Sequence, residues 1–154
     1  MKVIALLTAP DAHQRTILVV EDYEDTRDFL DVLINTETSY RVLSIADGDE
    51  TLERVEELAA IQPVLFIFDF QLPAMTALHL FDRLHGFKVF EHIPAIIITA
   101  ITPTPEMESA IRARGLELLL KPFDVEDLLR CIEQALQHRL QSTRAANEGS
   151  PEPI

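Results

Sequence analysis

The sequence is poor in the residues on which several classes of protein depend. Its single cysteine, Cys131, excludes an intramolecular disulfide and argues against a cysteine-based zinc site. Its four glycines include no Gly-x-Gly-x-x-Gly loop, so a flavin- or dinucleotide-binding domain is a poor interpretation. No apolar run approaches the length of a membrane span, and the run from Val3 to Leu7 is too short for a signal peptide. We therefore expect a cytoplasmic protein.

Positive charge is also scarce. Lys and Arg total 13 residues against 26 acids, which gives a formal net charge of −13. Nucleic acid and anionic membranes would repel such a surface, so neither is expected as a direct partner. A cation, or a protein with a basic patch, fits this charge better.

Apolar runs alternate with amphipathic segments along the chain, whose 154 residues fit one domain with short extensions. Strands are predicted at residues 16–20, 41–46, 64–68, 95–98 and 116–120. Helices are predicted at about 25–35, 52–59, 77–84 and 106–114, and from 125 onward. This alternation predicts an α/β domain in which helices cover both faces of a parallel sheet.

Both ends of the chain are expected to lie outside this sheet. We predict an N-terminal extension at 1–15, the domain at 16–140 and a tail at 141–154. The tail is polar and contains Gly149, Pro151 and Pro153, so it is predicted to be disordered or to serve as a linker. With no effector domain after the sheet, a stand-alone domain is favoured, and a piece of a longer protein is the alternative.

Charged and hydroxyl side chains follow four of the predicted strands. Glu21 and Asp22 follow the first strand, Asp69 the third, Thr99 the fourth and Lys121 the fifth. Right-handed crossovers bring the C-terminal ends of parallel strands to one edge, where ligands of such sheets bind. Three carboxylates meeting there would repel one another unless a cation lies between them, and oxygen ligands favour Mg²⁺.

The remaining groups at this edge suit a phosphoryl group. Thr99 offers a hydroxyl donor and Lys121 a compact ammonium. Asp69 follows five apolar residues of the middle strand and is the best candidate for a nucleophile, which would form an aspartyl phosphate. Each residue alone has an ordinary explanation, such as a helix cap at Asp22, but their coincidence at four strand ends favours a functional site.

These segments resemble the receiver domain of two-component response regulators. The match covers about residues 16–140 and consists of four motifs in order: ILVVED at 17–22, FDFQLPAM at 68–75, IPAIIITA at 93–100 and KPF at 121–123. The resemblance implies a flavodoxin-like fold, a doubly wound five-stranded parallel sheet with strand order 2-1-3-4-5. It implies a phosphoacceptor signalling domain that assists its own phosphorylation and dephosphorylation, not an enzyme in the usual sense.

The resemblance also implies a role for each site residue. Asp69 is the expected phosphoacceptor, and Thr99 and Lys121 are expected to bind phosphoryl oxygens. Pro122 is expected to follow a cis peptide bond. The expected Mg²⁺ ligands are Glu21 acting through water, Asp22, Asp69 and the backbone carbonyl of Gln71.

The implied partners are proteins. A sensor histidine kinase or a histidine phosphotransfer protein is expected to donate the phosphoryl group. A downstream protein is expected to bind the surface formed by the fourth helix, fifth strand and fifth helix, and a homodimer is a further arrangement.

Several positions depart from the family pattern. Ala77 stands where a glycine is usual, and Leu118 replaces an aromatic residue of the fifth strand. Gln71 and Ile101 flank the phosphoryl position. Gln71 could orient a water molecule but Ile101 cannot, which predicts self-dephosphorylation slower than in an Ile101→Glu variant.

Two other functions stay open. A receiver-like module that binds partners without being phosphorylated is favoured by Leu118 and by the proline-rich loop at 102–105. A phosphatase of the haloacid-dehalogenase type also uses a strand-end Asp and Mg²⁺. That family needs an acid two residues after the nucleophile, where this chain has Gln71.

Overall fold

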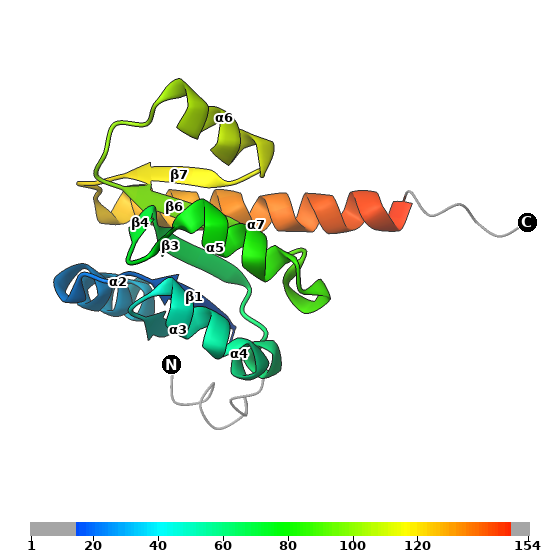
Figure 1. The fold of residues 1–154 in the computed structure, drawn as a ribbon. Helices are drawn as coiled ribbons and strands as arrows, with labels where there is room; N and C mark the ends of the chain where they lie inside the picture. Colours follow the sequence, from blue (N-terminus) through cyan, green and yellow to red (C-terminus); the bar gives the residue numbers. More distant parts are fainter. Residues whose placement is uncertain (1–14, 149–154) are drawn as a thin grey trace, which may run out of the picture.

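The computed structural model describes residues 15–148, in which five strands form one parallel sheet (Figure 1). The strands are β1 (Thr16–Val20), β2 (Arg41–Ile45), β3 (Leu65–Asp69), β6 (Ala95–Thr99) and β7 (Glu117–Leu120). Their order in the sheet is β2-β1-β3-β6-β7, and all neighbours are parallel. The predicted order 2-1-3-4-5 is therefore confirmed.

Helices cover both faces of this sheet. They are α2 (Glu24–Glu37), α3 (Gly48–Glu53), α4 (Val55–Ile61), α5 (Ala77–His85), α6 (Pro105–Ala113) and α7 (Val125–Glu148), with a 3-10 turn η2 (Lys88–Phe90). The core on one face includes Leu30 of α2 and Leu128 of α7, and the core on the other includes Leu58, Leu80 and Ile111 of α4, α5 and α6. The doubly wound arrangement is thus observed.

The central strand β3 explains why its sequence is continuously apolar. Phe66 and Phe68 face the core under α5, whereas Leu65 and Ile67 face the core under α2 and α7. All four side chains are buried, and the rings of Phe66 and Phe68 stack with their centroids 5.3 Å apart. Burial on both faces therefore fixes the strand and brings the polar residue that follows, Asp69, to the C-terminal edge of the sheet.

Side-chain caps determine where several helices begin. At α7, the Asp124 carboxylate accepts a hydrogen bond from the Asp127 amide (2.8 Å), and the Asp127 carboxylate accepts one from the Asp124 amide (3.4 Å). This reciprocal cap is predicted by the spacing of the two acids. Asp47, Thr76 and Thr104 cap α3, α5 and α6 in the simpler way, each accepting from an amide of the first turn.

The structure differs from the prediction at the C-terminal end of the described residues. Residues 141–148 belong to α7, which projects beyond the sheet (Figure 1), where a disordered tail or linker was predicted. The segment from Gln141 to Glu148 is rich in good helix formers and contains neither glycine nor proline, so no residue ends the helix before Gly149. Residues 1–14 and 149–154, which hold most of the predicted extension and the rest of the tail, lie outside the described residues.

The segment at 52–59 also differs from the prediction of one helix. It holds parts of two helices, α3 and α4, which meet at Arg54, where the backbone leaves the helical conformation. None of the helices within residues 15–148 combines the length and the apolar character needed to cross a membrane.

A short hairpin after β3 was not predicted. β4 (Gln71–Leu72) pairs antiparallel with β5 (Met75–Thr76), and the turn between them consists of Pro73 and Ala74. Ala74 has a φ of 66°, a left-handed conformation that disfavours residues with a Cβ. The sequence contained one indication of this turn, because Pro73 occupies its first central position, where proline is common.

We expect the variant Ala74→Gly to raise the free energy of unfolding by about 0.5 kcal/mol, because glycine adopts positive φ without steric cost. The matched control is Gly115→Ala, where φ is 67° and an added Cβ would meet no atom within 4 Å. That variant is expected to lose about 1 kcal/mol through backbone conformation alone. Urea unfolding measures both, and a loss of stability in Ala74→Gly would contradict this account.

Candidate functional site

Three carboxylates gather at the C-terminal edge of the sheet and form what we call the acidic site: Glu21, Asp22 and Asp69. Glu21 and Asp22 follow β1, and Asp69 ends β3. β1 and β3 pair with Val20 opposite Phe68, so the residues that follow are brought together. One carboxylate oxygen from each acid lies within 4.8 Å of the other two. The convergence predicted from the strand ends is therefore observed.

Glu21 is the most enclosed acid of the three, with 1% of its surface exposed. Its carboxylate accepts a hydrogen bond from the Tyr23 amide (3.2 Å), and its own amide donates to the Ile45 carbonyl (3.1 Å). Burial, and then repulsion by Asp69, raises the pKa of the Glu21 carboxyl from 4.5 to about 7. Near neutral pH this carboxyl is therefore partly protonated unless a cation joins the site.

Lys121 brings positive charge to the acidic site from the end of β7. Its Nζ lies 3.3 Å from Asp69 Oδ2 and 3.4 Å from Glu21 Oε2. Its backbone amide donates to the Thr99 carbonyl (2.8 Å), which joins the ends of β6 and β7. The peptide bond between Lys121 and Pro122 is cis, as the family resemblance implies.

Asp69 is held on one side and accessible on the other. Its Oδ1 accepts a hydrogen bond from the Gln71 amide (3.2 Å), while Oδ2 faces Lys121. About 14% of its side chain is exposed, so the carboxylate is within reach of a reactant from solvent. The hydrogen bond brings the Gln71 backbone next to the site, and the expected role of the Gln71 carbonyl stays a prediction.

Thr99 ends the strand next to β3. It is buried, and β6 pairs with β3 so that Ile98 lies opposite Asp69. The Thr99 hydroxyl accepts a hydrogen bond from the Ile101 amide (3.1 Å), and the Ile101 side chain is 41% exposed. The expected contact between Thr99 and a phosphoryl group also stays a prediction.

The donor set of the acidic site fits a small divalent cation. Three carboxylates face one ammonium, so negative charge is in excess. Oxygen-only donors are the ligands that Mg²⁺ prefers, and Asp22 is exposed, which leaves space for the water molecules that Mg²⁺ retains. Glu21, Asp22 and Asp69 are the residues that would hold it.

Sequence reasoning missed Arg27, whose guanidinium donates to the Glu21 carbonyl at 3.0 Å from the first turns of α2. This contact supports the chain where β1 leaves the sheet. Nothing in the sequence pattern distinguishes Arg27 from an ordinary surface arginine.

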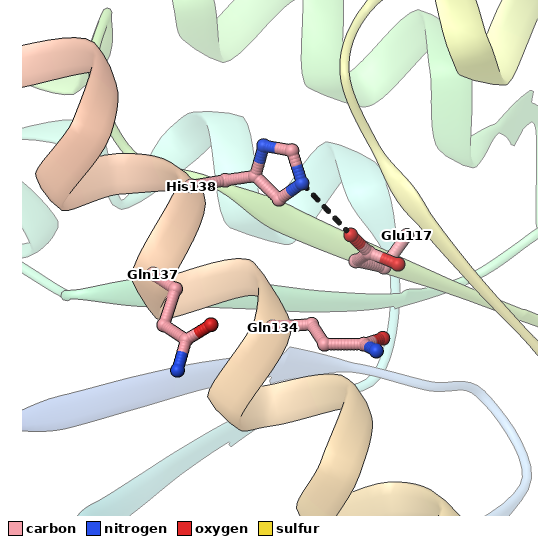
Figure 2. A pocket seen from close by; sticks show the side chains of 4 residues that line it. All are labelled: Glu117, Gln134, Gln137 and His138. Atoms are coloured by element: carbon pink, nitrogen blue, oxygen red, sulfur yellow. Dashed lines mark ion pairs between the residues drawn. The ribbon is translucent and has the colours of Figure 1, made fainter.

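A separate polar pocket of about 250 Å³ lies at the opposite edge of the sheet. Figure 2 shows the side chains that line it: Glu117, Gln134, Gln137 and His138. His138 Nε2 lies 3.6 Å from Glu117 Oε1. Glu117 begins β7, whereas Lys121 follows its end, so a full strand separates this pocket from the acidic site.

Known proteins resemble this chain in sequence and in structure. The response regulator receiver domain family matches residues 17–133. An uncharacterised 14.6 kDa protein from the sodA1 3′ region of Leptolyngbya boryana is 31% identical over 121 residues, which cover 79% of this chain and 89% of that protein. The transcriptional regulatory protein CrdR of Helicobacter pylori is 30% identical over 118 residues, which cover 75% of this chain and 51% of CrdR.

Solved structures resemble the fold of this chain. The crystal structure of a CheY-like receiver domain protein from Methanospirillum hungatei aligns with a TM-score of 0.72 at 24% identity, covering 84% of this chain and 98% of that one. This alignment supports the fold.

In Mg²⁺-free buffer, we expect the free energy of unfolding to fall as the pH rises from 5 to 8. The pKa of Glu21 is higher in the folded chain (about 7) than its ordinary value of 4.5, so its contribution is complete below pH 4.5 and is lost as the pH passes 7. Between pH 5 and 8, the free energy of unfolding of the wild type is expected to fall by on the order of 2 kcal/mol more than that of Glu21→Gln, which lacks the titrating group.

Urea unfolding at several pH values measures this loss. Glu24→Gln, which removes an exposed acid of α2, is the control and is expected to keep the wild-type profile. Parallel curves for the wild type and Glu21→Gln would contradict the prediction.

Proposed function

This chain belongs to the response regulator receiver domain family, and we propose that Asp69 is its phosphoacceptor, with Mg²⁺ held by the acidic site. Receiver domains are phosphoacceptor signalling domains of two-component systems that interact with histidine kinases and downstream targets, and the family binds Mg²⁺ at an acidic pocket. The proposal is carried by one observation: three carboxylates lie within 4.8 Å of one another beside the Lys121 ammonium.

The surroundings of Asp69 suit attack on phosphorus. A carboxylate oxygen of Asp69 would form the new O–P bond while the bond from phosphorus to the donor group breaks, and the donor would leave with that electron pair. Mg²⁺, when bound, supplies positive charge that neutralises phosphoryl oxygens. The Gln71 amide orients the Asp69 carboxylate, and Lys121 is close enough to neutralise a phosphoryl oxygen.

Thr99 is proposed to couple phosphorylation of Asp69 to a conformational change. A phosphoryl group adds roughly −1.5 to −2 charges at Asp69, and the Thr99 hydroxyl can donate to one of its oxygens. The chain from Ala100 to Pro105 would follow Thr99 and move α6, in which Ile111 is the buried residue. The resulting change at α6, β7 and α7 is the proposed signal.

This surface also suits the proposed downstream partner. Leu120 of β7 and Val125 of α7 are apolar side chains with 48% and 37% of their surface exposed. Burial of exposed apolar area is the main driving force of protein association, so the surface of α6, β7 and α7 can bind a downstream protein or a second copy of this chain. A sensor histidine kinase or a histidine phosphotransfer protein is the proposed phosphoryl donor.

We expect incubation with Mg²⁺ and acetyl phosphate to add one phosphoryl group to the protein, measured by intact mass. Asp69→Asn should gain none, because it lacks the nucleophilic carboxylate, and chelation of Mg²⁺ should abolish the gain in the wild type. Asp28→Asn, which removes an exposed acid of α2, is the control and should be labelled normally. A wild-type protein that stays unmodified would instead favour an interaction module that works without phosphorylation.

We expect Ile101→Glu to speed loss of the phosphoryl group by about tenfold, because a carboxylate at this position can orient and deprotonate the attacking water. The decay of the phosphorylated protein after removal of acetyl phosphate gives the rate. Val125→Glu introduces the same charge at the start of α7 and should decay like the wild type. Decay of the native protein as fast as that of Ile101→Glu would refute the prediction.

A further inference from the structure

Gly48 lies where the Cβ of any larger residue would collide with the Met75 side chain, which belongs to the hairpin that follows Asp69. It is the buried first residue of α3. A Cβ built at this position would overlap Met75 Sδ and lie 2.9 Å from Met75 Cγ and 3.1 Å from Met75 Cε. The Met75 side chain therefore occupies the space that a side chain at position 48 would need.

Hydrogen bonds hold the start of α3, and with it Gly48, in place. The Asp47 carboxylate accepts from the Glu50 amide (2.7 Å), and the hydroxyl of the buried residue Thr51 donates to the Asp47 carbonyl (2.8 Å). Just before this turn, the Ile45 carbonyl accepts from the amide of Glu21 (3.1 Å). Gly48 is thus fixed relative to one of the three acids of the acidic site.

Met75 joins this support to the hairpin. Met75 pairs with Leu72, and Gln71 pairs with Thr76 at the base of the same hairpin. The Gln71 amide in turn donates to Asp69 Oδ1 at 3.2 Å. This pairing and this hydrogen bond form a path by which a displacement of Met75 can reach the Gln71 backbone beside the Asp69 carboxylate.

We propose that the contact between Gly48 and Met75 holds the hairpin in register with the acidic site, which makes both residues positioning residues for Mg²⁺. The inference rests on the proposed function and on the expected role of the Gln71 carbonyl as a further ligand of the ion. Neither residue touches the ion. They act through the backbone that carries Gln71, and loss of such supporting contacts weakens metal sites.

The first test is Gly48→Ala in the full-length chain, titrated with Mg²⁺ and followed through the NMR shifts of the Asp69 and Gln71 amides. The added Cβ displaces Met75, so the dissociation constant for Mg²⁺ should rise by about tenfold. The Gln71 amide signal should also move before any Mg²⁺ is added. Gly86→Ala is the matched control, because Gly86 ends α5 at the far edge of the sheet, and it should leave the affinity unchanged.

Met75→Ala examines the same contact from the other side and does not depend on how well Gly48→Ala folds. It should also weaken Mg²⁺ binding, because it leaves the hairpin without its support. In the Met75→Ala background, adding Gly48→Ala should have no further effect, because the colliding side chain is gone. Thermal unfolding without Mg²⁺ reports whether each variant is folded.

The outcomes separate this inference from the proposed function. If the wild type binds Mg²⁺ and both Gly48→Ala and Met75→Ala bind it with the same affinity as the wild type, this inference alone is overturned. An equal effect of Gly48→Ala with and without the Met75 side chain would overturn it as well. A wild-type protein without any response to Mg²⁺ would overturn the proposed function and this inference with it.

Discussion

Glu21 and Asp69 hold two carboxylates next to each other at the ends of two adjacent strands, and the fold has to compensate their repulsion. Lys121 contributes one ammonium, 3.3 Å from Asp69 and 3.4 Å from Glu21. Burial and the remaining excess of negative charge raise the pKa of the Glu21 carboxyl to about 7. The same excess that weakens the cation-free protein suits a divalent cation, which the proposed phosphoryl transfer to Asp69 requires.

The apolar interior makes this repulsion tolerable. β1 and β3 are buried between two layers of helices, and their burial supplies the free energy that holds two acids at adjacent strand ends. The parallel register pairs Val20 with Phe68, so the acids that follow them, Glu21 and Asp69, must lie side by side. A site of this kind depends on a core large enough to offset it, and the chain has such a core on both faces of the sheet.

The two sides of the acidic site differ in how firmly they are held. On one side, capping hydrogen bonds hold the start of α3, and the Met75 side chain of the β4–β5 hairpin packs against Gly48. On the other side, α6 has Ile111 as its buried residue and is tied to α5 at its end by the ion pair of Arg114 with Asp82 (2.8 Å). A firm side suits metal binding, and a lightly packed helix suits the transmission of a signal.

The sequence predicts the strands and the identity of the acids, because an apolar run that ends in a polar residue is a local pattern, and its four motifs imply the strand order through their resemblance to receiver domains. It also determined the reciprocal cap of Asp124 and Asp127, which is a local interaction. Three properties could not be predicted from the sequence: the raised pKa of Glu21, the place of Met75 against Gly48 and the ion pair of Lys121 with Glu21, residues 100 positions apart. These properties depend on distances and burial, which exist only after the whole chain has packed. The helical residues 141–148 show the opposite case, in which local propensity was informative and the polar composition outweighed it in the prediction.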